Sequence, residues 1–329
     1  MRPWWWMTLL VLPICLFRED CVMARTQPEP PRLATWVAGS RALTHAALLA
    51  ASLREFGGAL AAETLWVYLD PGLGDPAALA CPPGCRLVLA PAAPAEAAGL
   101  PFAGKPGAAA AAERVALAAG RTGLAWLDDD TVILAEPAAF TLPAGVDLGW
   151  RPVMHRNIAP LAGAAPGPFW SRLWQLLDVP AAAHFPCVTV ADGDRVRTYV
   201  NAGCLVVRPE AGLLQAWAED FRCAAADDEL RALCRQEARQ ALFLHQAALG
   251  ATIARRTRAS QRFLLPESYN WPLLFDELFG ARRDFHDLTG VVSLRHEGLL
   301  PAAGGERLER LCGPPAILDW LRLPPTPRE

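Results

Sequence analysis

Short β-forming runs alternate with helical stretches from Leu33 onward, and this alternation constrains the fold more than any other feature of the sequence. A β-type run at residues 33–38 is followed by a helical pattern at 44–56. The next predicted elements are strands at 65–69, 86–89 and 124–127 and an alanine-rich helix at 108–119. The run at 124–127 is apolar throughout, as in strands buried on both faces of a parallel sheet. The pattern therefore predicts an α/β fold with a mostly parallel central sheet flanked by helices.

The second half of the chain continues this pattern less regularly. Strands are predicted at 147–153, 199–207, 262–265 and 291–295, and helices at 169–177, 211–221 and from the Asp227–Asp228 cap to about Ile253. Because no internal repeat and no long linker divides the chain, we expect a single folded domain at 32–300. Residues 1–31 are then a leader, and residues 301–329 form a C-terminal helical tail.

Composition excludes several classes of protein. Lys and Arg number 31 against 34 Asp and Glu, which gives a formal net charge of −3, so we expect no nucleic-acid partner. No apolar run reaches the ~18 residues that a transmembrane helix needs. The cysteines lack zinc-site spacing and indicate reduced thiols in a cytoplasmic protein. For the closely spaced pair Cys81 and Cys85, the alternatives to reduced thiols are a disulfide across a turn or half of a metal site.

The leader has three interpretations. Arg2 followed by an apolar run from Trp4 to Phe17 fits an export signal, although no small-residue cleavage site follows. The tryptophans of this run also fit interfacial anchoring, with peripheral contact at the inner face of the membrane. We favour the third interpretation, in which Met23 is the true start, because it opens a polar, proline-rich segment just before the first strand.

Three consecutive carboxylates, Asp128, Asp129 and Asp130, follow the buried run at 124–127. In open α/β sheets, ligands bind at the carboxyl ends of the strands. Two carboxylates at positions i and i+2 of an extended segment point the same way, and their oxygens suit a hard cation that bridges to a diphosphate. The alternative is an Asp-rich turn or helix cap. The position after a buried strand favours the metal and diphosphate site.

Other polar residues of the sequence also have candidate roles in binding. Gly203 lies within a β run, which marks a close backbone approach or a β-bulge, and the amide of Asn201 can bond sugar hydroxyls. Lys105, the only lysine of the chain, has two candidate roles: it neutralises a diphosphate, or it is a solvated loop charge. The same two roles apply to Arg41. Helical spacing puts His245 on an apolar stripe with Gln246 at its margin, and this polar pair faces either a cleft or the core.

Five segments, in this order, resemble the metal-dependent nucleotide-sugar glycosyltransferases of the GT-A fold, in their glycogenin and lipopolysaccharide-transferase branch. They are 124–137 (LAWLDDDTVILAEP), 199–209 (YVNAGCLVVRP), 243–249 (FLHQAAL), 265–272 (LPESYNWP) and 294–298 (LRHEG). They are similar to the family's Asp-x-Asp motif, its Asn-Ala-Gly segment, its Asp-Gln-x-x-Leu helix, its Leu-Pro-x-x-Tyr-Asn loop and its late histidine segment.

The resemblance implies a GT-A-type fold, a nucleotide-sugar donor and a bound Mn²⁺ or Mg²⁺ ion. The metal ligands it implies are Asp128, Asp130 and His296. The donor contacts are Arg41, Lys105, Asp129, Asn201 and Gly203, and the catalytic pair is His245 and Gln246. The acceptor is a glycan, lipid or protein that the sequence does not identify. If the reaction inverts the anomeric centre, its base would come from among Glu237, Glu267, Asp276 and Glu297.

Two departures from the family pattern keep alternatives open. His245 stands where the family has Asp, and no Lys-Pro-Trp segment follows His296. The first departure favours a non-catalytic relative that binds a nucleotide sugar. A phosphatase of the haloacid-dehalogenase type, with Asp128 as nucleophile, ranks behind both because strands precede the motif and no lysine follows it.

Overall fold

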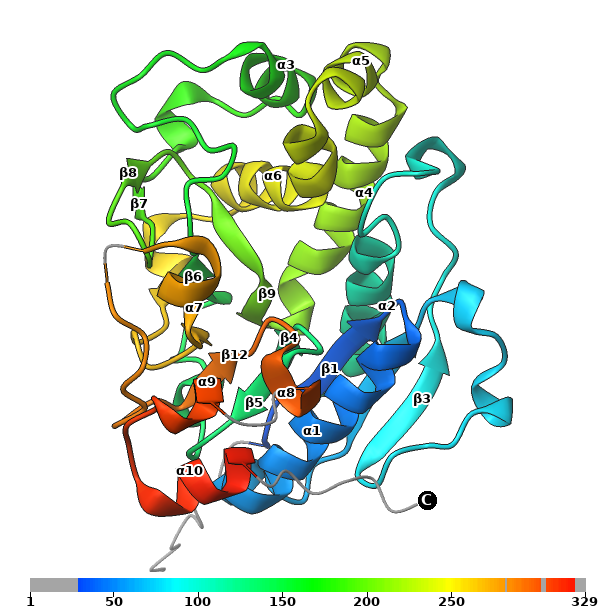
Figure 1. Cartoon of the computed structure of the whole chain (residues 1–329). Helices are drawn as coiled ribbons and strands as arrows, with labels where there is room; N and C mark the ends of the chain where they lie inside the picture. The colour runs from blue at the N-terminus through cyan, green and yellow to red at the C-terminus, as the bar shows by residue number, and fades with distance from the viewer. Residues whose placement is uncertain (1–28, 282, 303–305, 323–329) are drawn as a thin grey trace, which may run out of the picture.

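A seven-stranded sheet forms the centre of the molecule (Figure 1). The structure is a computed structural model, and it describes residues 29–281, 283–302 and 306–322. The strands lie in the order β10-β6-β9-β4-β1-β2-β3. They are β1 (Arg32–Val37), β2 (Leu65–Leu69), β3 (Cys85–Leu89), β4 (Leu124–Leu127), β6 (Leu148–Pro152), β9 (Val200–Val207) and β10 (Arg262–Leu264). Only β9 runs against its neighbours, so the predicted α/β fold with a mostly parallel sheet is confirmed.

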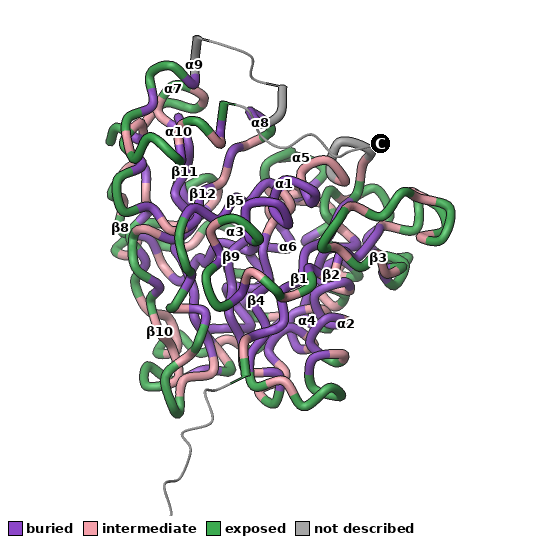
Figure 2. The backbone as a smooth tube through the Cα atoms, turned by 90° about the horizontal axis from the view of Figure 1, so that it is seen from below, coloured by how far each residue is buried: buried purple, intermediate pink, exposed green. Residues whose placement is uncertain are grey.

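Helices cover both faces of this sheet because the side chains of each strand alternate between them. In β1, Leu33 and Val37 pack with α1 (Ser40–Phe56) on one face. Ala34 and Trp36 belong to the larger core on the opposite face. The helices of that face are α2 (Lys105–Ala118), α4 (Leu213–Ala226) and α6 (Ala238–Arg256). Figure 2 shows the resulting buried centre, in which the sheet strands are purple and the outer loops are green.

A second, three-stranded sheet brings distant parts of the chain to the end of β4. Its order is β11-β12-β5, from Trp271–Pro272, Ser293–Arg295 and Thr131–Ile133. β12 pairs antiparallel with β5, and the register sets Arg295 opposite Thr131. Since β5 directly follows the three aspartates, this pairing carries Arg295, His296 and Glu297 to the same place.

The remaining elements surround these sheets. They are α3 (Pro168–Leu176), the hairpin β7 (Cys187–Val188) and β8 (Arg195–Val196), α5 (Asp228–Gln236), α7 (Phe275–Phe279), α8 (Leu299–Ala302), α9 (Glu306–Glu309) and α10 (Pro315–Arg322). Helices α9 and α10 lie in the predicted C-terminal tail, whereas residues 1–28 of the predicted leader lie outside the described residues. No helix in the described ranges is both long and apolar enough to cross a bilayer.

The helix predicted from Asp227 to about Ile253 is wrong as one element. It is divided at Glu237, which has extended backbone angles (φ −131°, ψ 102°) and caps α6. The Glu237 carboxylate accepts a hydrogen bond from the backbone N–H of Arg239 (3.1 Å), which satisfies a donor that a helix start leaves free. Hydrophobic spacing continues across the break, so periodicity alone did not reveal it.

Candidate functional site

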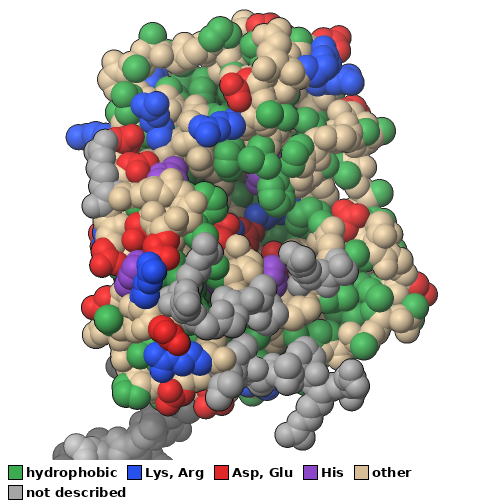
Figure 3. Space-filling model, viewed as in Figure 1, with side chains coloured by type: hydrophobic (Ala, Val, Ile, Leu, Met, Phe, Trp, Pro, Cys, Tyr) green, Lys and Arg blue, Asp and Glu red, His purple; other side chains and the backbone are tan. Residues whose placement is uncertain are grey.

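A cavity of about 660 Å³ opens beside the ends of β1 and β4. Figure 3 shows a hollow near the middle of this face, with charged side chains at its floor. The predicted site residues that line the cavity are Lys105, Asp128, Asp129, Asp130, Asn201, His245 and Gln246. Of the other predicted residues, Gly203 and His296 lie behind the cavity wall, and the side chain of Arg41 lies outside the described part of the chain.

Gly203 fixes the position of Asp128. The backbone N–H of Asp128 donates to the carbonyl of Gly203 (2.8 Å), which ties the aspartate to β9. A Cβ atom at Gly203 would lie 1.9 Å from Oδ2 of Asp128 and 2.3 Å from its Cγ. The close approach that a glycine in a strand predicts is therefore made by the Asp128 carboxylate.

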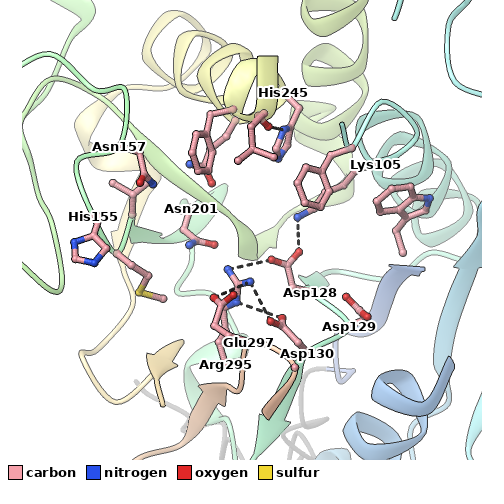
Figure 4. Close-up of a pocket in the computed structure, with 18 of the residues that line it drawn as sticks. Lys105, Asp128, Asp129, Asp130, His155, Asn157, Asn201, His245, Arg295 and Glu297 are labelled. Atoms are coloured by element: carbon pink, nitrogen blue, oxygen red, sulfur yellow. Dashed lines mark hydrogen bonds and ion pairs between the residues drawn. The ribbon is translucent and has the colours of Figure 1, made fainter. Parts of the chain in front are cut away.

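Two basic side chains converge on this carboxylate (Figure 4). The Nζ of Lys105, which begins α2, donates to Oδ1 of Asp128. Arg295 reaches Oδ2 of Asp128 with Nη1 (3.3 Å). The same guanidinium donates to both oxygens of Asp130, from Nε at 3.2 Å and from Nη2 at 3.1 Å. Its Nη2 also lies 3.2 Å from Oε1 of Glu297.

Asp129 points to a different partner. Its Oδ2 lies 3.1 Å from Nδ1 of His45, on α1. The ring of His45 in turn meets the ring of His296 edge to face, with 4.8 Å between centroids. His296 is fully buried, and its Nε2 has no hydrogen-bond partner among the described residues. The middle aspartate is thus directed to α1, away from the pair that Arg295 holds.

The pKa values of these groups follow from burial and from the cations beside them. Burial raises the pKa of Asp128, but the charges of Lys105 and Arg295 outweigh it and hold that pKa below its usual value. For Asp129 and Glu297 burial prevails, helped by the neighbouring carboxylates, and the pKa of each is raised. Burial lowers the pKa of His296 to about 4, so its ring is neutral at pH 7.

The wall opposite the aspartates comes from β9 and α6. Asn201 Oδ1 accepts a hydrogen bond from the N–H of Gly203 (2.7 Å), and Gln246 Oε1 accepts one from the N–H of Ala202 (3.2 Å). The ring of His245 packs against the ring of Phe102 at a centroid distance of 4.9 Å. Both residues of the predicted catalytic pair therefore line the cavity from α6, and Gln246 also holds the β9 backbone.

The buried state of His245 predicts a measurable pH dependence. Burial, and then the charge of Lys105, lowers the pKa of His245 to about 3, whereas the unfolded chain has the ordinary value of 6.5. As the pH falls below 6.5, the unfolded chain binds a proton that the folded protein does not, so stability is lost at about 1.4 kcal/mol per pH unit.

We therefore expect the wild type to lose about 2 kcal/mol more than His245→Gln between pH 6.5 and pH 5, because the variant lacks this proton uptake. Urea unfolding of both proteins at these two pH values measures the difference. Parallel losses in the two proteins would show that His245 is not held neutral by the fold.

Sequence reasoning gave no role to three side chains at the site. Arg295 stands beside His296 in the segment LRHEG, and nothing in the sequence sets its charge beside the aspartates. His45 gave no signal, because a single histidine in an amphipathic helix has no partner visible in the sequence. Phe102 lies in the turn before α2 with a left-handed backbone (φ 59°), and only the structure sets it beside His245.

The candidate bases and metal ligands are also placed by the structure. Of the four carboxylates considered as bases, only Glu297 lines the cavity. Within the described ranges, a single group of three His, Cys, Asp or Glu has its ligand atoms within 4.8 Å of one another. That group is Asp276, Asp284 and His286, which contains none of the predicted metal ligands.

Part of the chain matches a known protein family. Residues 109–257 match the model of the Rhodobacterales glycosyltransferase domain. Similar solved structures include mouse xyloside xylosyltransferase 1 in its apo form (12% identity, TM-score 0.44, 82% of this chain and 99% of that chain). Another is the galactosyltransferase LgtC in complex with donor and acceptor sugar analogues (12% identity, TM-score 0.46, 89% of this chain and 97% of that chain).

No curated protein is significantly similar to the chain in sequence. The domain match nevertheless covers β4, the three aspartates, β9 and α6, which form much of the cavity wall. The prediction of a glycosyltransferase domain is confirmed over residues 109–257.

Proposed function

We propose that the protein transfers a sugar from a nucleoside-diphosphate sugar, bound in the cavity beside β4, to a hydroxyl of an acceptor. The observation that carries this proposal is the meeting of Lys105, Asp128 and Arg295 at the floor of that cavity. Cations beside the diphosphate stabilise the charge that develops there as the bond to the anomeric carbon breaks. Lys105 is the only lysine of the chain, and it is buried at this point.

The other wall residues have matching roles. Asn201 and Gln246 offer amide groups near the position that the sugar would take, and Gln246 holds β9 in place. Glu297 has a raised pKa and lies in the cavity, so it is the candidate base for the acceptor hydroxyl. The acceptor (glycan, lipid or protein), the cytoplasmic location and the peripheral membrane contact stay predictions.

The Mn²⁺ or Mg²⁺ ion predicted from the sequence does not fit these residues as they lie. A divalent ion needs free carboxylate oxygens, but those of Asp128 and Asp130 are bound by Lys105 and Arg295. His296, the predicted third ligand, does not join the two aspartates in any group of ligand atoms within 4.8 Å, among the described residues. We therefore route no step of the reaction through a metal ion.

Thermal unfolding in the presence of nucleoside diphosphates tests the donor site. UDP, GDP, CDP and ADP are each added to the full chain, with Mn²⁺ and separately with EDTA. We expect one of them, at about a hundred times its Kd, to add roughly 2.7 kcal/mol of stability, a rise of several degrees in Tm. Lys105→Met/Asp128→Asn removes the cation proposed to face the diphosphate together with its partner charge, and it serves as the binding-site variant.

Three outcomes separate the alternatives. A shift with one diphosphate that the double variant lacks, together with turnover of the matching nucleotide sugar, supports the transferase. Tight binding without turnover of any sugar would instead support the non-catalytic relative. No shift with any diphosphate, while the protein is folded, would contradict a donor site and favour the phosphatase alternative.

A further inference from the structure

Arg295 occupies the space between the two aspartates that the sequence assigns to a metal ion. It is the last residue of β12, and pairing of that strand with β5 sets it beside the turn that holds Asp128 and Asp130. Figure 4 shows its guanidinium between these two carboxylates and Glu297. The side chain is largely buried (17% exposed), so this is not an ion pair at the surface.

The protein's own cations engage every carboxylate oxygen of the pair. Lys105 holds Oδ1 of Asp128, and Nη1 of Arg295 lies 3.3 Å from its Oδ2. Both oxygens of Asp130 accept from Arg295 in the parallel, two-point arrangement that suits a guanidinium. Each of the four oxygens already has a cationic partner, so a divalent ion would have to bind against that positive charge or displace Arg295.

Moving Arg295 away has a cost. The three carboxylates beside it hold its pKa well above the ordinary value, although burial opposes this. A displaced guanidinium would lose these bonds and would have to find new partners in a largely buried place.

From this geometry we infer that Arg295 is a built-in cation in the position of the expected metal ion, and that the protein binds its donor diphosphate without a divalent metal. This inference rests on the proposed function, because it concerns the same donor. Arg295 and Lys105 balance the charges of Asp128 and Asp130. The remaining N–H groups of Lys105 then face the diphosphate. The start of α1 lies beside the same cavity, because Ala38 and Gly39 line it, and this helix start has no side-chain cap and no acidic residue in its first turn.

The wild-type protein alone gives the first test. Mn²⁺ is titrated into the full chain and free Mn²⁺ is followed by electron paramagnetic resonance, which needs no activity. Binding of the nucleoside diphosphate selected by the thermal screen is then measured by calorimetry with Mn²⁺ and with excess EDTA. We expect no tight Mn²⁺ binding by the protein and less than about a twofold difference between the two diphosphate Kd values.

Removal of Arg295 gives the second test. Arg295→Gln frees both oxygens of Asp130 and Oδ2 of Asp128, so we expect this variant to gain Mn²⁺ binding and to bind the diphosphate at least about tenfold more tightly with Mn²⁺ than with EDTA. Arg255→Gln is the matched control, because Arg255 pairs with a single buried carboxylate, Asp220 (2.7 Å), on α4. It should gain neither property.

The outcomes distinguish this inference from the proposed function. Diphosphate binding by the wild type that requires Mn²⁺ would overturn the inference and leave the donor site standing. Absence of diphosphate binding under both conditions would overturn the proposed function and, with it, the inference. If Arg295→Gln does not fold, the wild-type titrations alone decide between metal-dependent and metal-independent binding.

Discussion

Gly203→Ala is expected to lower the free energy of unfolding by about 3 kcal/mol and to remove sugar transfer, because the new methyl group would overlap the Asp128 carboxylate. The Cβ position lies 1.9 Å from Oδ2 of that residue, far inside any normal contact. Either the aspartate or the β9 backbone has to move. Urea unfolding and a transfer assay on the purified variant measure the two effects.

Two controls separate this overlap from a general effect of alanine. Gly107 lies in α2 with nothing within 4 Å of its Cβ position, so Gly107→Ala should be neutral or stabilising. In an Asp128→Ala background the overlapping atoms are gone, and Gly203→Ala should then cost much less. Equal costs of Gly203→Ala in both backgrounds would show that Asp128 is not the neighbour that matters.

Lys105→Met is expected to destabilise the protein by about 3 kcal/mol and to slow transfer by at least about a hundredfold. The substitution leaves Asp128 without its hydrogen bond in a place where the lysine was buried. The stability loss is set at the low end for a buried pair because Arg295 still contacts Asp128. Urea unfolding and steady-state kinetics report the two quantities separately.

The double variant Lys105→Met/Asp128→Asn distinguishes folding from function. It removes both charges of the pair, so it should recover much of the stability that Lys105→Met loses. Transfer should stay low, since the cation beside the diphosphate is still missing. If transfer recovered together with stability, Lys105 would serve only to hold Asp128.

The fold could be predicted from the sequence where one strand or helix carried its own signal. The run at 124–127 is apolar because β4 is buried on both faces, and the glycines after Phe56 mark the end of α1. The small sheet could not be predicted, because β5 has three residues and its partner β12 lies more than a hundred residues away in the chain. The division between α5 and α6 was hidden by a hydrophobic pattern that continues through Glu237.

The same distinction between local and long-range signals applies to the residues of the candidate site. Asp128 and Lys105 could be singled out by local context, as an acidic end of a buried strand and as the only lysine. Their mutual contact could not, because it depends on how α2 starts beside β4. Arg295 could not be singled out for a related reason: the β12–β5 register places its charge beside the aspartates, and no spacing in the sequence reveals that register.

Release of nucleoside diphosphate from a panel of nucleotide sugars tests the central claim most directly. The full chain and the double variant Lys105→Met/Asp128→Asn are compared, since the variant is expected to be folded and to lack the charged donor site. We predict that the wild type turns over one donor, at least by slow hydrolysis, and that the variant does not. No release from any donor by the folded wild type, or equal release by both proteins, would contradict the assignment of this cavity as the site of sugar transfer.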